Sequence, residues 1–456
     1  MQPVGVMKAI PSLRKRGLRA GAWVVGSQVL SQVLRLASNL ILTRFLLPEA
    51  FGLMAVISTV LLMLMLFSDI GSGTTIVQSQ RGADEEFLNT AWTVQVMRGV
   101  GLWVVSVLLA LGLAFAQAAQ LVSPDTVYGD PRLPLMIAVA SFVTVINGFS
   151  SLNAKLAERN LDFAAVSLIE VGVGIVAIVA MALGAWWTGS VWVLVAGSLL
   201  TAAAKCALTH LVLKGPRSRF RLESEALREL FSKGKWVVVS SVLGLVAMSG
   251  DKLLLGGLVD STTLGLYSIA LGLASIASTA MSSLLGRVVF PVFSEVVRHR
   301  HQELPHVYLK LQQAVDACVG LLAGFVFMAA DVIVGVLYDA RYQGVGHILG
   351  ILAVGSVGIR FVVAEQVYLA MGQTSLLALA GLPRALIILV GVPLGYSMYK
   401  LDGALLAVVL SQFAHWPLAI WFRIQHKFSS LLNDVVLLPA IAAGLLAGRF
   451  VAQTVD

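Results

Sequence analysis

Residues 21–43 read GAWVVGSQVLSQVLRLASNLILT, and the rest of the chain is best interpreted from this stretch. It is long enough to cross a bilayer, because roughly twenty apolar residues in a helix span the hydrocarbon layer. A polar stripe on one face of that helix is costly in a membrane, unless it faces protein or a water-filled cavity. The stripe consists of four residues at spacings of three and four: Gln28, Gln32, Arg35 and Asn39.

The stretch and the segment that follows it have a copy later in the chain. Residues 21–53 align without a gap with residues 234–266, a shift of 213 positions that pairs Trp23 with Trp236 and Gly52 with Gly265. Duplicated halves are typical of secondary transporters, which bind substrate between the halves. We therefore expect two pseudo-symmetric bundles whose repeated helices cross the membrane in the same direction.

The composition excludes a soluble protein. Hydrophobic residues make up 58% of the chain and charged residues only 12%, and a soluble chain of this length cannot bury so much apolar surface. The net charge of +8 is interpreted as loop charge that reports orientation, not nucleic-acid binding. Cys206 and Cys318 fall in apolar segments and are expected to be inert. No disulfide framework, metal site or cofactor motif is expected.

The hydropathy pattern predicts an all-α polytopic membrane protein with about thirteen spans, within a range of 12–14. The N-terminal basic residues precede a long apolar run without a clear cleavage site, which favours a retained helix over a signal peptide. The predicted spans are 21–43, 50–70, 91–116, 133–153, 163–187, 190–213, 235–259, 264–288, 311–337, 345–369, 375–398, 403–422 and 430–450.

Lysine and arginine gather in alternate loops. The N-terminal segment and the loops 154–162, 214–235, 289–310 and 423–429 are basic, so the positive-inside rule places the N-terminus in the cytoplasm. Loop 214–235 carries apolar residues among its charges, which fits either an amphipathic interfacial helix that guides lipid headgroups or a simple connector. The predicted segments are a cytoplasmic tail 1–20, a six-helix bundle 21–213, a basic linker 214–234, a second six-helix bundle 235–424 and an additional helix 425–456.

Six short runs occur in a characteristic order along the chain: LPEAFGL at 47–53, FSDIG at 67–71, AERNLDF at 157–163, VWVLVAG at 191–197, LGLYSIA at 264–270 and RVVFPVFS at 287–294. Each run is weakly specific, whereas their order and spacing together are fairly specific. Together they resemble the polysaccharide or oligosaccharide transporter family of the multidrug/oligosaccharidyl-lipid/polysaccharide superfamily. The resemblance implies a MATE-like transporter fold and the flipping of a lipid-linked oligosaccharide.

Charges inside predicted spans are candidates for function, because buried charge is costly in a membrane. Cations outnumber acids among them, and surplus positive charge in a low dielectric suits an anionic headgroup such as a sugar diphosphate. We hypothesise that an inner set captures the pyrophosphate and passes it along Arg35. The substrate-binding candidates are the stripe residues Gln28, Gln32, Arg35 and Asn39, together with Arg98, Lys252, Arg360 and Arg384.

Three acids in the predicted spans are candidates for coupling transport to a proton or sodium gradient: Glu170, Asp251 and Glu365. Simpler roles stay open for the same charges. Arg98 and Lys205 are placed where their side chains can reach the inner interface by snorkelling. Asp251 and Lys252 are adjacent, so they point about 100° apart on a helix and can each pair with a neighbouring helix.

Motifs of enzyme chemistry are missing from the sequence, which has no phosphate-binding glycine loop, HExxH or nucleophile elbow. The predicted function is a flippase of the bacterial inner membrane for a polyprenyl-diphosphate-linked oligosaccharide, such as an O-antigen, capsule or exopolysaccharide unit. It would work by alternating access. Its expected partners are membrane lipids and the polysaccharide polymerase machinery. The alternatives are a multidrug or organic-cation antiporter, a flippase for the peptidoglycan lipid precursor, and a membrane glycan polymerase or ligase.

Overall fold

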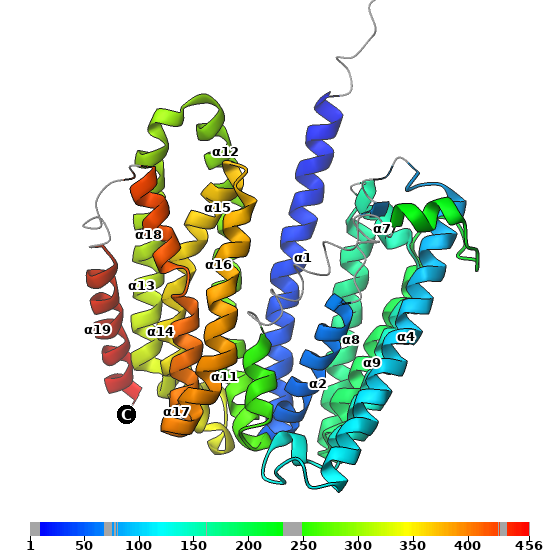
Figure 1. The fold of residues 1–456 in the computed structure, drawn as a ribbon, viewed down its shortest axis with the longest axis horizontal. Helices are drawn as coiled ribbons and strands as arrows, with labels where there is room; N and C mark the ends of the chain where they lie inside the picture. Colours follow the sequence, from blue (N-terminus) through cyan, green and yellow to red (C-terminus); the bar gives the residue numbers. More distant parts are fainter. Residues whose placement is uncertain are drawn as a thin grey trace, which may run out of the picture. The chain divides into compact units, whose positions relative to one another are not determined.

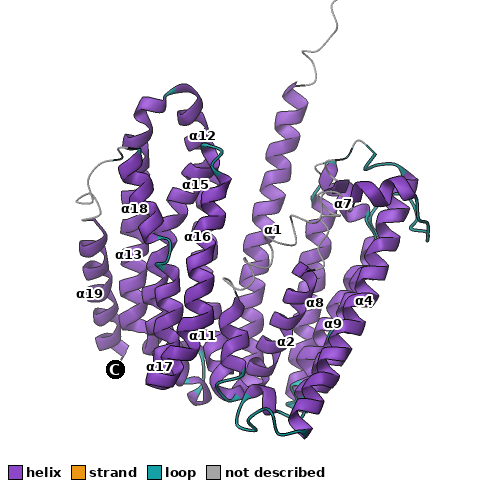
Figure 2. Ribbon diagram, viewed as in Figure 1, coloured by secondary structure: helices purple, strands orange, loops and turns teal. Residues whose placement is uncertain are grey.

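The computed structural model describes residues 10–67, 75–76, 79, 81–160, 162–230, 249–426, 428 and 436–455. Helices dominate the described residues, and no strand occurs among them (Figure 2). This is the expected outcome in a bilayer, because a helix satisfies its backbone hydrogen bonds within itself. The predicted all-α fold class is thus confirmed. Most of the predicted span 235–259 falls outside the described residues.

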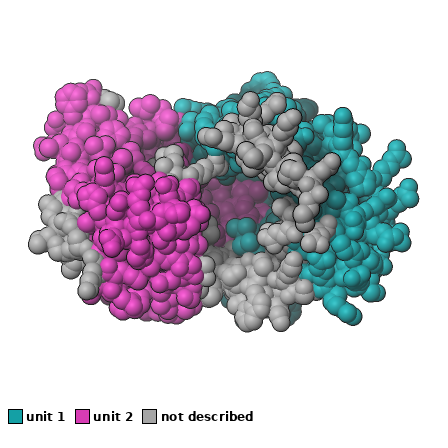
Figure 3. Space-filling model, turned by 90° about the horizontal axis from the view of Figure 1, so that it is seen from above, with its two compact units in different colours: residues 1–46, 60–121, 131–241 teal, residues 47–59, 122–130, 242–456 magenta. Residues whose placement is uncertain are grey.

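The chain forms two compact units (Figure 3). Unit 1 comprises residues 1–46, 60–121 and 131–241, and unit 2 comprises residues 47–59, 122–130 and 242–456. The helix α2 (Pro48–Phe67) begins in unit 2 and continues into unit 1 from Val60. The segment boundaries expected from the sequence stay a prediction.

Unit 1 is a bundle of long helices in which α8 packs against both α1 and α9 (Figure 1). Two details fix the α1–α8 contact. The Ser167 hydroxyl donates to the Ser27 hydroxyl at 3.2 Å, and Gly174 lies beside Leu34. The helices of unit 1 are α1 (Ile10–Phe45), α4 (Glu85–Ala118), α5 (Leu133–Ala140), α6 (Phe142–Gly148), α7 (Asn153–Arg159), α8 (Ala164–Thr188) and α9 (Trp192–Leu211).

The described part of the basic linker is strapped to unit 1. Backbone N–H groups of Arg219, Arg221 and Glu223 donate to side chains near the start of α4 at 2.8–3.0 Å. The side chain of Arg81 donates to Glu223 at 2.8 Å, and this hydrogen bond raises the pKa of Arg81. Leu230 is fully buried against unit 1. Leu230 therefore packs on protein, whereas Phe220 and Leu222 are exposed, so the connector and the lipid-headgroup guide both stay open.

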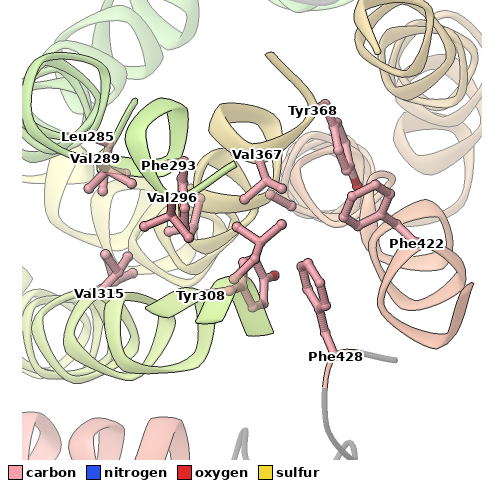
Figure 4. Packing of buried hydrophobic residues seen from close by; sticks show 14 of the residues in the cluster. Leu285, Val289, Phe293, Val296, Tyr308, Val315, Val367, Tyr368, Phe422 and Phe428 are labelled. Atoms are coloured by element: carbon pink, nitrogen blue, oxygen red, sulfur yellow. The ribbon is translucent and has the colours of Figure 1, made fainter. Parts of the chain in front are cut away.

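Unit 2 holds the remaining helices, several of which are interrupted by tighter or wider turns. Its core gathers the buried aromatic rings of α12, α13, α15 and α18, where Tyr368 and Phe422 meet with ring centroids 4.6 Å apart (Figure 4). The elements of unit 2 are α11 (Ser261–Leu284), α12 (Phe290–His299), α13 (Leu304–Leu337), α14 (Gly344–Gly355), η5 (Ser356–Phe361), α15 (Val362–Ala370), α16 (Thr374–Leu386), α17 (Val392–Gln412), α18 (Trp416–Gln425) and α19 (Leu437–Val455).

The first turns of α2 and α11 meet through two glycines that the internal repeat matches to each other. A Cβ at Gly52 would lie 2.0 Å from the carbonyl oxygen of Ser261, and a Cβ at Gly265 would lie 1.9 Å from that of Pro48. Ser261 stands 213 positions after Pro48, which is the shift of the repeat. The contact is therefore reciprocal, and all four residues belong to unit 2.

Two hydrogen bonds hold the chain at the start of α11 and in the helical segment 249–256 before it. Asp260 caps the helix by accepting from the Thr263 N–H at 2.9 Å. Partial burial alone would raise the pKa of Asp260, but the hydrogen bonds that its carboxylate accepts, those from Thr263 foremost, together lower that pKa. The Tyr128 hydroxyl donates to the Leu253 carbonyl at 2.7 Å, and burial raises the pKa of Tyr128 to about 12. Tyr128 therefore stays a hydrogen-bond donor at any physiological pH.

The last helix, α19, lies along α13 through two identical pentads (Figure 1). Residues 320–324 and 444–448 both read GLLAG. A Cβ at Gly324 or at Gly444 would lie within 2.4 Å of backbone oxygen on the other helix. Small residues four apart let membrane helices approach closely. The helix α19 overlaps the predicted last span, 430–450.

Nine helices among the described residues are long and apolar enough to cross a membrane, or ten when the bent pair at 133–159 is counted as one span. The predicted count of thirteen spans stays a prediction. Two physical reasons explain why the count of long apolar helices is lower than thirteen. The polar stripe lowers the hydropathy of α1. The run Ser375–Gln425 counts as one helix, although Tyr399 and Lys400 break its backbone between the predicted spans 375–398 and 403–422.

Candidate functional site

A cavity of about 880 Å³ lies within unit 2. Its charged and titratable lining residues come from four different elements: Lys252, Glu365, Arg384 and His415. Three of these four, Lys252, Glu365 and Arg384, are predicted site residues. The cavity thus brings together two substrate-binding candidates and one ion-coupling candidate.

Lys252 reaches the cavity because its neighbour Asp251 is directed elsewhere. The two residues lie in the helical segment 249–256. Asp251 is buried and accepts a hydrogen bond from the hydroxyl of Tyr267, which is fully buried on α11. Successive helical residues point about 100° apart. Pairing of Asp251 with a neighbouring helix, one of the two roles left open by the sequence, is therefore observed.

Arg384 is placed where the backbone of α16 departs from regular geometry. Pro383 stands just before it inside the helix, and a π-helical segment, Ile387–Gly391, follows. Such segments are frequent at functional sites. The Nε of Arg384 is buried and has no hydrogen-bond partner in the described ranges, although the carboxylates of Asp251 and Glu365 are near enough to attract the guanidinium. A buried unpaired donor in a cavity wall is ready for an acceptor on a ligand.

His415 and Glu365 form a second polar group in the cavity wall. The Nδ1 atom of His415 lies 3.4 Å from Oε1 of Glu365, and their side chains are 8% and 35% exposed. The rings of Phe361 and Tyr368 lie 5.8 and 5.7 Å from the imidazole. The Nε2 atom of His415 has no hydrogen-bond partner among the residues that the structure describes. Aromatic walls thus hold the imidazole edge in place within the cavity.

Hydroxyl groups from one face of α11 line another wall of the same cavity. Ser275 and Ser278 donate to carbonyl oxygens of their own helix, which leaves the lone pairs of their oxygens as acceptors. Such a surface suits a ligand rich in hydroxyl donors. The hydroxyl residues of this wall are Ser268, Ser275, Ser278, Thr279 and Ser282.

Arg360 is not among the residues that line the cavity. Its guanidinium donates to Asp316 Oδ2 at 2.8 Å, and the carboxylate also accepts from Gln312 at 2.8 Å. The side chain of Arg360 is 10% exposed and that of Asp316 is fully buried. The pair ties the 3-10 segment η5 to α13. The predicted contact of Arg360 with substrate stays a prediction, and the observed bond is a structural one.

A smaller polar pocket of about 310 Å³ lies within unit 1. Lys205 pairs with Glu170 at 3.1 Å across it, and both side chains are 45% exposed. Gln95 on its wall donates to the carbonyl oxygens of Asn147, Gly148 and Ser150. Glu170, which is also an ion-coupling candidate, therefore lies in a different unit from Glu365. Arg98, one turn beyond Gln95 on α4, is half-buried and does not line this pocket.

One hydrogen bond joins two residues of the polar stripe of α1. The side chain of Arg35 donates to Gln32 at 2.5 Å, so the two share a face. Gln28 and Arg35 are exposed within the structure, whereas Asn39 is half-buried with an unpaired Oδ1 atom. None of the four lines the cavity of unit 2 or the pocket of unit 1. Their contact with substrate stays a prediction.

Neither His415 nor the hydroxyl wall of α11 was predicted from the sequence. The wall carries a signal of the same kind as the stripe in residues 21–43, because Ser268, Ser275 and Ser282 recur every seven residues. A single histidine before Trp416 and Pro417 carries no comparable pattern. Its position becomes visible only when α15 and α18 are placed side by side.

Comparison with known proteins adds evidence that is independent of the cavity. Residues 41–346 match the model of a family described as polysaccharide biosynthesis protein. The chain is 24% identical over 337 residues to the succinoglycan biosynthesis transport protein ExoT of Rhizobium meliloti (strain 1021), covering 72% of this chain and 65% of that protein. It is 22% identical over 314 residues to the teichuronic acid biosynthesis protein TuaB of Bacillus subtilis (strain 168), covering 68% and 62%.

A third relative is the lipopolysaccharide biosynthesis protein WzxC of Escherichia coli (strain K12), which is 22% identical over 290 residues, 62% of this chain and 56% of that protein. The chain thus matches less than two thirds of the length of each of these relatives. Among solved structures, it resembles the lipid II flippase MurJ with a TM-score of 0.66 at 13% identity, covering 95% of this chain and 92% of that one.

A multidrug resistance MATE family transporter of the MOP superfamily is also similar, with a TM-score of 0.60 at 13% identity over 87% of this chain and 94% of that one. At this identity the two likenesses speak for the fold alone. They confirm the MATE-like transporter fold that the motif resemblance implied.

Proposed function

Since this chain belongs to the polysaccharide biosynthesis protein family, a membership that confirms the resemblance of its sequence motifs, we propose that it is a flippase for a lipid-linked glycan. The cargo is a polyprenyl-diphosphate-linked oligosaccharide, moved across the bacterial inner membrane by alternating access. The N-terminus lies in the cytoplasm, as the basic loops favour. The names of the curated relatives, two of which concern succinoglycan transport and lipopolysaccharide biosynthesis, support this class of cargo.

The observation that carries the proposal is the chemistry of the cavity in unit 2. Two cationic side chains, Lys252 and Arg384, line the same cavity as a face of hydroxyl groups on α11. The cations suit the diphosphate, and guanidinium groups hydrogen-bond phosphate oxygens strongly. The hydroxyl face suits the sugar hydroxyls next to it. A multidrug antiporter for organic cations would need a cavity dominated by acids instead.

The first test of the function is mass spectrometry of the polyprenyl-linked lipid pool in cells depleted of the protein. A flippase predicts the build-up of one completed oligosaccharide unit on the cytoplasmic leaflet. The polymerase machinery that would use this unit outside then stops for lack of substrate. A build-up of the peptidoglycan lipid precursor would assign the other flippase activity. An unchanged lipid pool with new sensitivity to cationic drugs would overturn the proposal in favour of the antiporter.

The cationic pair gives a prediction for variants. Replacing Lys252 and Arg384 together by methionine keeps most of the side-chain volume and removes both charges. We expect glycan export to fall by at least about tenfold, because each charge-assisted hydrogen bond contributes on the order of 1.5–3 kcal/mol. Export is measured as surface glycan in depleted cells that express the variant at the wild-type level. Lys310→Met is the control, because Lys310 is exposed and lies outside the cavity.

We propose that an ion gradient drives the transport through one or more of three acids, Glu170, Asp251 and Glu365. Glu170 has the clearest arrangement for this role, because its ion pair with Lys205 is half-exposed in a polar pocket. We expect Glu170→Gln to change the pH dependence of transport into vesicles that carry an imposed proton or sodium gradient. Glu158→Gln is the matched control on the same pocket, paired with Lys155. Equal responses of both variants and wild type would remove Glu170 from the mechanism.

A further inference from the structure

The imidazole of His415 is buried in the wall of the cavity with one nitrogen unpaired. Within the described part of the chain the Nε2 atom makes no hydrogen bond, although the side chain is only 8% exposed. A buried polar atom without a partner costs free energy. The cost is recovered when a ligand in the cavity supplies the missing partner. The same holds for the unpaired Nε of Arg384, which lines the same cavity.

One carboxylate, that of Glu365, lies beside the imidazole of His415. Glu365 on α15 lies 3.4 Å from Nδ1, and a carboxylate at that distance attracts a protonated ring. The hydroxyl of Tyr368, also on α15, has no partner among the described residues, and on η5 the charge of Arg360 is taken up by Asp316. The remaining charged groups that share the cavity are Arg384 on α16 and Lys252 in segment 249–256.

Protonation of His415 changes the charge of the cavity. With a neutral imidazole, the lining carries two cations, Lys252 and Arg384, and the carboxylate Glu365. A protonated imidazole adds one positive charge, and both of its nitrogens then become donors. Nδ1 donates toward Glu365, and Nε2 is left to donate into the cavity. Histidine is the side chain whose charge changes between about pH 5 and pH 8.

We propose that His415 is a proton-controlled ligand of the anionic headgroup. The protonated imidazole bridges Glu365 and a phosphate oxygen of the cargo, and together with Arg384 it holds the headgroup tightly. Loss of the proton removes one positive charge and weakens the hold. The proposal rests on the proposed function, since it concerns the same cavity and the same anionic cargo. It makes substrate affinity dependent on the pH of the side to which the cavity opens.

The test measures the binding of inorganic sulfate to the purified full-length protein by isothermal titration calorimetry, at pH 5.5 and at pH 7.5. Sulfate keeps the same charge at both values, so any change in affinity comes from the protein. We expect wild-type protein to bind sulfate roughly tenfold more tightly at pH 5.5, because one unit charge is added a few ångströms from the anion.

Two variants of His415 make the result specific. His415→Gln is expected to bind weakly at both pH values, and His415→Lys, which keeps a fixed charge, is expected to bind tightly at both. His347→Gln is the matched control, because His347 forms the other histidine–carboxylate pair described in unit 2, with Asp402 at 2.8 Å, and does not line the cavity. This control is expected to keep the wild-type pH dependence.

The outcomes separate the inference from the proposed function. Sulfate affinity that is equal at both pH values in wild-type protein would overturn the role of His415 and leave the anion-binding cavity intact. Affinity that depends on pH to the same extent in His415→Gln would overturn it as well. A third outcome is that wild-type protein binds sulfate at neither pH and does not differ from the double variant Lys252→Met and Arg384→Met. This outcome would overturn the cavity as an anion site, and the proposed function with it.

Discussion

Replacing Asp316 by alanine is expected to lower the free energy of unfolding by about 3–5 kcal/mol, the typical cost of breaking a buried ion pair by removing one partner. The carboxylate is fully buried, and it accepts hydrogen bonds from Arg360 and Gln312. Its removal takes the charged acceptor of this ion pair away from the guanidinium of Arg360, which is only 10% exposed. Thermal unfolding of the purified protein in detergent, followed by circular dichroism, measures the loss.

Two comparisons decide whether the buried pair is the cause. Asp339→Ala removes a pair of the same kind, with Arg341 at 2.5 Å, but the two side chains are 29% and 37% exposed. We expect a loss below about 1 kcal/mol there, because water screens exposed pairs. The double variant Asp316→Leu and Arg360→Met should recover much of the stability, because no buried charge remains. Equal losses for Asp316→Ala and Asp339→Ala would contradict this explanation.

The second large effect is expected at the reciprocal glycine contact. Gly265→Ala places a methyl group 1.9 Å from the Pro48 carbonyl oxygen, and Gly52→Ala places one 2.0 Å from that of Ser261. A backbone oxygen cannot turn away as a side chain can, so the helices must separate. We expect each substitution to lower the free energy of unfolding by about 1–3 kcal/mol or more, measured in the same thermal assay.

The symmetry of the contact provides its own check. Because the two glycines meet equivalent atoms, their alanine variants should cost similar amounts, and the double variant should cost less than the sum of the two. Gly335→Ala is the control, since Gly335 lies in α13 with open space around it, and alanine there should add about 0.5–1 kcal/mol of stability. A clear loss in this control would indicate a general intolerance of alanine, not a specific contact.

Much of the helical architecture could be predicted from hydropathy alone. The predicted spans 163–187 and 345–369 correspond closely to α8 and to the run Gly344–Ala370, because apolar length is what a bilayer requires of a helix. The assignment of α2 to both units could not be predicted. It depends on which atoms the helix touches along its length, and no pattern in the residues 48–67 records that.

The candidate site was predictable only in part. Lys252, Glu365 and Arg384 were identified because a charge inside an apolar span is conspicuous, and the fold places all three around one cavity. The sequence could not separate them from Arg360, which is equally conspicuous but pairs with Asp316, 44 residues earlier. His415 was missed because a lone histidine has no period. Such pairings depend on helix packing, which brings together residues that are far apart in the chain.

The contact between Gly52 and Gly265 has a consequence for the origin of the chain. In a two-fold symmetric dimer, residue i of one copy meets residue j of the other, and j meets i in return. The pairs Gly52 with Ser261 and Gly265 with Pro48 repeat this rule within a single polypeptide, at the shift of the internal repeat. An ancestor of half this length would have had this contact available for association with its own copy. Fusion of two such genes preserves the interface and frees the other positions of each half to diverge.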